Sequence, residues 1–153
     1  MYTFVLAVHS WVRWVVLLAG AGAVVLAVVG AMKRRPWGSA EERWGRVFTM
    51  SLDIQILLGL VLYFLLSPIT RAALSDFGAV MGSAGLRFWA VEHVFGVLVA
   101  VALAHVGRGR SKKVADPVAR HRAVAICYGL ALLALILSIP WPGTPNGRPL
   151  VRF

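Results

Sequence analysis

The sequence predicts an all-α integral membrane protein, a bundle of four transmembrane helices joined by short loops. Apolar residues make up 59% of its 153 residues, charged residues only 14%, and the mean hydropathy is +0.78. A soluble domain carries about a quarter charged residues. The apolar residues fall into four runs, each near the roughly 20 residues that a helix needs to cross a bilayer. We therefore expect residues 1–153 to form a single transmembrane domain.

The first two spans have clear limits in the sequence. Residues 2–32 form a run longer than the apolar core of a signal peptide, and its positive charges follow it. We expect this run to stay in the protein as a membrane helix. Residues 47–66 form the second span. Ser39 and Glu42 before it read as a capping box that starts the helix, and Pro68 stops it on the far side of the membrane.

The third and fourth spans have similar boundary signals. Residues 86–106 form the third span, and Gly107 is expected to close it. Residues 123–139 form the fourth span. Asp116–Pro117 reads as the N-cap and first residue of this helix, and Pro140 ends it.

Basic residues are distributed unequally between the two sides of the membrane. Most lie in the loops after the first and third spans, at Lys33, Arg34, Arg35, Arg43, Arg46, Arg108, Arg110, Lys112, Lys113, Arg120 and Arg122. The other side has only Arg71, Arg87, Arg148 and Arg152. The positive-inside rule then places the two basic loops in the cytoplasm and both termini outside. We therefore expect a multi-pass protein of the cytoplasmic membrane with its N- and C-termini outside.

Composition and motifs exclude several functions. The net charge of +10 lies in short blocks between apolar runs, where it contacts anionic headgroups of the lipid bilayer, so we expect no nucleic-acid partner. Cys127 is the only cysteine, which rules out an intrachain disulfide and a covalently attached c-type haem. The sequence also lacks the phosphate-binding, dinucleotide-binding and zinc-protease motifs.

Two histidines in the apolar runs point to a haem. Helices rise about 1.5 Å per residue, so His9 and His93 both lie roughly 10 Å below the outer surface, on separate helices. A bis-histidine haem b needs such a pair of iron ligands. Arg87 can pair with a haem propionate, and small residues leave room for the macrocycle, namely Gly20, Gly96, Ala100 and Ala104. The alternative is that the imidazoles hydrogen-bond to the backbone or to each other, or face water at the outer interface.

Other ionisable residues at bilayer depth need partners too, because such groups are costly in lipid. Arg13 and Asp53 have opposite charges and depths that an arginine side chain can bridge, so we expect them to pair, with Gln55 beside them. This group either fixes helix packing or forms a quinone or proton site, and the former is favoured. Glu92 is left open between a bond to His9 and proton transfer.

A second haem between His105 and His121 is less favoured. His105 is rotated about 120° from the face of His93. His121 lies among Arg120 and Arg122 at the start of the fourth helix, where a solvated interfacial histidine is the ordinary interpretation.

The chain resembles a group of small four-helix bacterial membrane proteins that are often labelled cytochrome b-like. The resemblance rests on these stretches: HSWVRW at 9–14, DIQILLGLVLYF at 53–64, RFWAVEH at 87–93, GRGRSKK at 107–113, HR at 121–122 and SIPW at 138–141. It implies a bacterial inner-membrane location. It also implies that His9, His93 and His121 belong to the family pattern, and that His105 does not.

Together these observations favour a b-type cytochrome-like protein or subunit with one non-covalent haem b, passing electrons to or from a quinone or a partner protein. The alternative is a haem-free accessory subunit that packs with other membrane subunits in a respiratory or photosynthetic complex. The chain has no sizeable extramembrane domain for a second redox centre, so both hypotheses favour a subunit over a free-standing enzyme. A transporter is less favoured, because four helices leave little room for alternating access.

Overall fold

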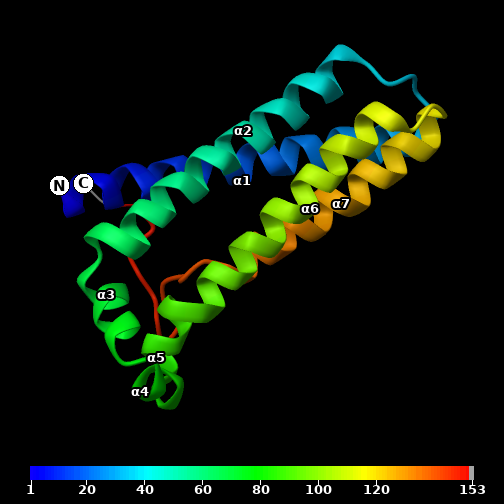
Figure 1. Cartoon of the computed structure of the whole chain (residues 1–153). Coiled ribbons are helices and arrows are strands. Elements are labelled where there is room, and N and C mark those ends of the chain that lie inside the picture. Colours follow the sequence, from blue (N-terminus) through cyan, green and yellow to red (C-terminus); the bar gives the residue numbers. More distant parts are fainter. Residues whose placement is uncertain (152–153) are drawn as a thin grey trace.

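A computed structural model describes residues 1–151 and confirms the predicted all-α class (Figure 1). Within these residues, four helical spans are long and apolar enough to cross a membrane: Tyr2–Met32, Ser39–Leu66, Ala84–Lys113 and Pro117–Ser138. The long helices that form them are α1 (Tyr2–Met32), α2 (Ser39–Val61), α6 (His93–Lys113) and α7 (Pro117–Ser138). The chain is therefore a four-helix, multi-pass membrane bundle.

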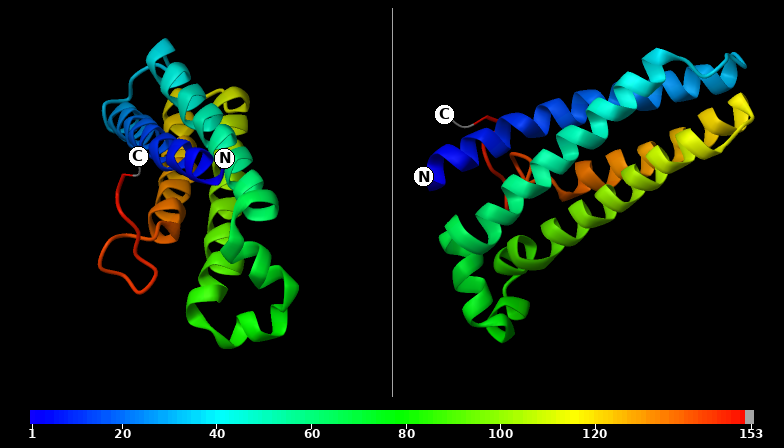
Figure 2. Two further views of the ribbon diagram at one scale, coloured as in Figure 1. Left: turned by 90° about the vertical axis from the view of Figure 1, so that its left-hand side faces the viewer. Right: turned by 45° about the horizontal axis from the view of Figure 1, so that its top comes forward.

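The long helices pack as two antiparallel pairs, α1 with α2 and α6 with α7 (Figures 1 and 2). Contacts between α1 and α7 and between α2 and α6 close the bundle. Its core runs along the centre and includes Val16, Phe48, Leu52, Val124 and Tyr128. The N-terminus and the end of the described chain lie at the same end of the molecule (Figure 1).

Two spans contain a π-helical turn. Leu62–Leu66 continues α2, and Phe88–Glu92 precedes α6. The hydroxyl of Tyr63 in the first turn donates a hydrogen bond to the carbonyl of Ala90 in the second, at 2.8 Å. π-helical turns often occur at functional sites because the wider turn redirects side chains. Here they join α2 to α6 at the end of the bundle where the termini lie.

The segment between α2 and α6 differs from the predicted loop. It forms three short helices, α3 (Pro68–Ser75), α4 (Phe77–Gly82) and α5 (Ala84–Arg87), which extend beyond one end of the bundle (Figure 2). Side-chain caps start two of them: Ser67 accepts from Thr70 N at 3.3 Å, and Asp76 accepts from Ala79 N at 3.0 Å. These helices were not predictable from the sequence because they are too short for an apolar period to show.

Two predicted boundaries need correction. α2 starts one residue earlier than the predicted capping box implies, since Gly38 is the N-cap and Glu41 accepts from its backbone N–H at 3.1 Å. α6 does not end at Gly107 but continues to Lys113. A Cβ atom at Gly107 would lie 2.6 Å from the ring of Tyr128, so this glycine serves close packing on α7. The predicted N-cap Asp116 is confirmed, as its carboxylate accepts from Ala119 N at 2.7 Å.

Candidate functional site

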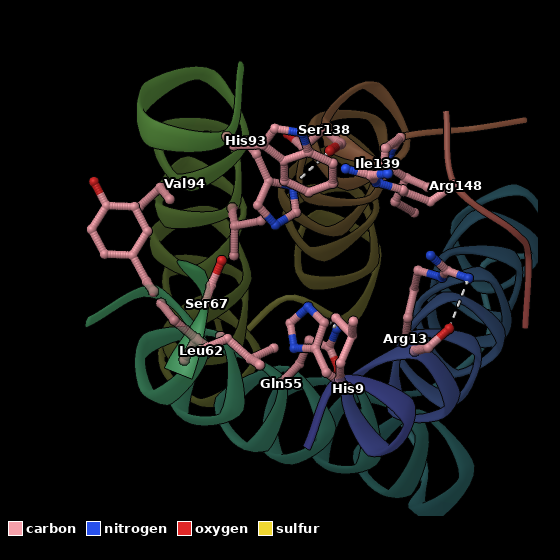
Figure 3. A pocket seen from close by; sticks show the side chains of 18 of the residues that line it. His9, Arg13, Gln55, Leu62, Ser67, His93, Val94, Ser138, Ile139 and Arg148 are labelled. Carbon is pink, nitrogen blue, oxygen red and sulfur yellow. Dashed lines mark hydrogen bonds between the residues drawn. The ribbon is translucent and has the colours of Figure 1, made fainter. Parts of the chain in front are cut away.

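A cavity of about 290 Å³ lies between the spans at the end of the bundle that holds the termini (Figure 3). Its volume is near the lower end of the range for small-molecule sites, about 300–1,000 Å³. Apolar side chains form most of its wall. The polar residues come from every long helix, from the first π-helical turn, from the start of α3 and from the C-terminal segment: Tyr2, His9, Ser10, Arg13, Gln55, Tyr63, Ser67, Thr70, His93, Ser138 and Arg148.

His93 lies at the start of α6 with one ring nitrogen fixed. Its Nδ1 is 2.8 Å from the backbone carbonyl of Ser138 on α7, to which it donates. The rings of Phe88 and Trp89 pack near it, with centroids 6.0 and 5.9 Å away. A carbonyl at Nδ1–H sets the neutral tautomer, in which Nε2 keeps its lone pair for a metal. This is the arrangement that metal-binding histidines commonly show.

His9 faces the same cavity from α1. Figure 3 shows the imidazoles of His9 and His93 directed toward each other across it. His9 Nε2 is 3.2 Å from the side-chain nitrogen of Gln55 on α2. Among the described residues, no hydrogen-bond partner reaches His9 Nδ1 or Gln55 Oε1, and both atoms are buried.

The two unmatched atoms suggest how His9 can bind a ligand. Amide oxygen and nitrogen are interchangeable by a half-turn of the side chain. Turned in this way, Gln55 accepts from His9 Nε2–H, and Nδ1 then has a free lone pair. A buried polar atom without a partner requires an explanation, and a bound group in the cavity supplies one.

The cations of the cavity are Arg13 and Arg148. Arg13 donates to the backbone carbonyl of Leu150, which also accepts from Trp14 Nε1 at 3.1 Å. Arg148 lies over the ring of Trp89, 5.2 Å from its centroid. These contacts hold the C-terminal segment across the end of the bundle, beside α1. From the sequence, Arg148 was expected only to be a charge on the outer side, because nothing in a Gly/Pro-rich tail indicates where it folds back.

Arg87, expected to pair with a propionate, lies elsewhere. Its Nε donates to Glu92 at 2.8 Å, and its Nη1 donates to the carbonyl of Met81 at 3.3 Å. It is not among the residues that line the cavity. Glu92, whose role the sequence left open, is thus the partner of Arg87 and not of His9.

The small residues expected to make room for a macrocycle instead bring helices together. A Cβ atom at Gly96 would overlap Ser138 Oγ, and Ala100 and Ala104 are fully buried. A Cβ atom at Gly20 would lie 2.9 Å from Phe48. Small residues permit close helix packing in membranes. Close packing accounts for Gly20, Gly96, Ala100 and Ala104 in this bundle.

The expected pair of Arg13 and Asp53 is not formed. Asp53 Oδ1 accepts from His105 Nε2 at 2.8 Å, and Arg13 bonds to the C-terminal segment. Two residues along a helix correspond to about 200° of rotation, so Gln55 faces the cavity and Asp53 faces away. The depths expected from the sequence do not determine the direction in which each side chain points around its helix.

His105 and His121 are not brought together. His105 bonds to Asp53 on α2, while His121 is completely buried against α1 and the ring of Trp37, whose centroid is 4.9 Å away. Neither lines the cavity of His9 and His93. The prediction of a solvated, interfacial His121 is wrong, because Gly30 and Trp37 enclose its ring. The structure therefore gives no support to a second haem.

Comparisons of this chain with protein-family models, with curated proteins and with solved structures found no match.

Proposed function

We propose that this chain is a b-type cytochrome-like membrane protein that holds one non-covalent haem b between His9 and His93 and passes electrons through it. The observation that carries the proposal is the facing pair of imidazoles in Figure 3, on two helices and across one cavity. The bond from His93 Nδ1 to the Ser138 carbonyl supports it, because it leaves Nε2 available to iron.

The other groups around the cavity suit the parts of a haem. Apolar residues such as Val94 and Val97 suit the faces of a porphyrin, and the cations Arg13 and Arg148 suit its carboxylates. When bound, haem supplies one-electron chemistry, and two histidine ligands leave no iron position open for oxygen. The role of the chain is then to fix both imidazoles, neutralise the carboxylates and exclude water.

The proposal places the cavity near the outer face of a bacterial cytoplasmic membrane. The unequal basic loops support this orientation, with both termini outside. A quinone, or a redox partner among other membrane subunits, would then exchange electrons with the haem from that side.

A haem-free accessory subunit in a larger membrane complex is the second candidate. The observation that favours it is that both imidazoles already bond within the protein, His93 to Ser138 and His9 to Gln55. Under this hypothesis these bonds tie α6 to α7 and α1 to α2 at one end of the bundle.

The orientation is tested by labelling single cysteines. Ser39→Cys and Ala115→Cys place thiols at exposed positions in or beside the basic loops, and Ser75→Cys places one on the opposite side. With Cys127 replaced by alanine, we expect a membrane-impermeant maleimide to label intact cells at Ser75→Cys only. Labelling of Ser39→Cys or Ala115→Cys before the inner face is opened would reverse the topology.

Arg148 and Arg87 are expected to differ in their effect on haem binding, because only Arg148 lines the cavity. Arg148→Gln removes a charge that can bond a haem carboxylate, a contact of about 1.5–3 kcal/mol, so we expect haem to dissociate roughly ten- to a hundredfold more readily. Arg87→Gln is the matched control, because that side chain pairs with Glu92 outside the cavity. Transfer of haem to apomyoglobin measures the loss rate. Equal rates for the two variants would remove Arg148 from the haem site.

A further inference from the structure

A polar pair lies on the outside of the bundle, where α2 and α6 meet. Asp53 and His105 are hydrogen-bonded at 2.8 Å, and their side chains are 45% and 50% exposed. Asp53 lies six residues inside the expected span 47–66, and His105 lies one residue before the end of the expected span 86–106, so the pair is in the half of the membrane toward the basic loops. The exposed residues next to the pair on these two helix faces are apolar, including Met50, Leu57 and Ala102, and exposed basic residues, Arg46 and Lys112, follow toward the basic loops.

Such a pair is costly if it faces lipid. Ionisable groups within a membrane almost always face the bundle interior, a water-filled cavity or another polar group. Within residues 1–151, no partner bonds His105 Nδ1 or the second carboxylate oxygen of Asp53. Hydrocarbon cannot satisfy these atoms, which indicates that another protein surface covers them.

The arrangement of the pair suits a second copy of the same chain. Asp53 and His105 lie side by side at one depth, and one can accept the hydrogen bond that the other donates. A twofold axis along the membrane normal leaves Asp53 and His105 at the same depth in both copies. It also brings Asp53 of one copy to His105 of the other. With its imidazole protonated on both nitrogens, His105 of each copy would donate from Nε2 to its own Asp53 and from Nδ1 to Asp53 of the other copy, which satisfies the remaining atoms of both pairs.

We propose that the α2–α6 face is the interface of a homodimer, with Asp53 and His105 forming a four-member polar cluster at its centre. The exposed apolar residues of α2 and α6 pack around this cluster. Leu60 and Leu98 lie on this face and also line the cavity, so the interface borders the cavity. Asp53 and His105 themselves do not line it, and the test of the interface requires no haem.

Disulfide cross-linking in native membranes tests the interface. Leu57→Cys lies one helical turn from Asp53, and Ile126→Cys on α7 is the matched control, since each residue is 62% exposed. In a Cys127→Ala background, we expect mild oxidation to link Leu57→Cys chains into dimers and to leave Ile126→Cys chains monomeric. Absence of the Leu57→Cys dimer, equal linking at both positions, or linking of Leu57→Cys only to a different protein would overturn the proposal.

Exchange of the polar residues tests the cluster itself. Asp53→His gives a copy with two histidines on this face, and His105→Asp gives a copy with two carboxylates. Each variant alone is expected to lose its Leu57→Cys cross-link, because like groups meet across the axis. Co-expressed with different tags, the two variants are expected to link to each other. Failure of the co-expressed pair to link, with both chains present in the membrane, would contradict the cluster. Should either variant fail to accumulate, cross-linking of the chain with its native pair decides the proposal.

Discussion

His9→Ala and His93→Ala are each expected to abolish haem binding, while His105→Ala is expected to keep one haem per chain. Under the proposed function each cavity histidine would supply one of the two iron ligands, and the other ligand alone would hold a non-covalent haem weakly. His105 bonds to Asp53 outside the cavity. The haem content of purified protein from haem-replete cells, measured as a pyridine haemochrome, gives the ratio directly. The intact protein should show a Soret band that sharpens on reduction, as expected for a low-spin, six-coordinate iron.

Added imidazole distinguishes a variant that has lost only an iron ligand from a variant that has lost its fold. If His93→Ala only removes an iron ligand, imidazole added together with haem would enter the space left by the ring and restore haem binding with a low-spin spectrum. A protein that has unfolded would not recover in this way. A colourless intact protein, purified in detergents mild enough to retain haem, would overturn the proposed function. His9 and His93 would then be hydrogen-bonding residues of an accessory subunit.

The fold class was predictable because the length of an apolar run is enough to identify a membrane span. Apolar length located the four long helices, and a fixed rise per residue placed His9 and His93 near one depth. The direction of a side chain around its helix depends on how helices cross, and sequence does not give this. Asp53 and Gln55 show the consequence, since the first faces outward to His105 and the second faces the cavity.

Other parts of the site had no signal in the sequence. The π-helical turns that contribute Tyr63 and Trp89 to the cavity have no distinctive residue pattern. The return of the C-terminal segment that brings in Arg148 depends on long-range bonds such as that from Trp14 to Leu150. The stripe of Gly96 and small residues was visible, but space for a cofactor and close helix packing both require small side chains.

His121 had no clear role in the sequence, and its burial gives one. Its ring is completely enclosed, and a Cβ atom at Gly30 would overlap it. The ring also packs on Trp37, above which the guanidinium of Arg120 lies 5.7 Å from the ring centroid. These contacts join the end of α1, the first basic loop and the start of α7. Gly30 is therefore the residue that allows His121 to fill this space.

Gly30→Ala is expected to destabilise the bundle, although alanine favours a helix over glycine by about 1 kcal/mol. The added methyl group overlaps a buried ring that has no open space to move into, and overpacking of this kind costs about 1–3 kcal/mol. Gly129→Ala on α7 is the matched control, because a Cβ atom there meets nothing within 4 Å. Thermal unfolding in detergent should therefore show a lower Tm for Gly30→Ala and an unchanged or higher Tm for Gly129→Ala.

A double-mutant cycle identifies the contact responsible. Residues in contact show non-additive effects on the free energy of unfolding. His121→Ala alone should destabilise the protein by leaving a cavity, but in the Gly30→Ala background it also removes the overlap. The double variant should therefore be more stable than the sum of the two single changes implies. If the two effects simply add, Gly30 and His121 do not pack against each other, and the closure of this end of the bundle must rest on other contacts, such as the bond from Arg108 to Glu42 at 2.6 Å.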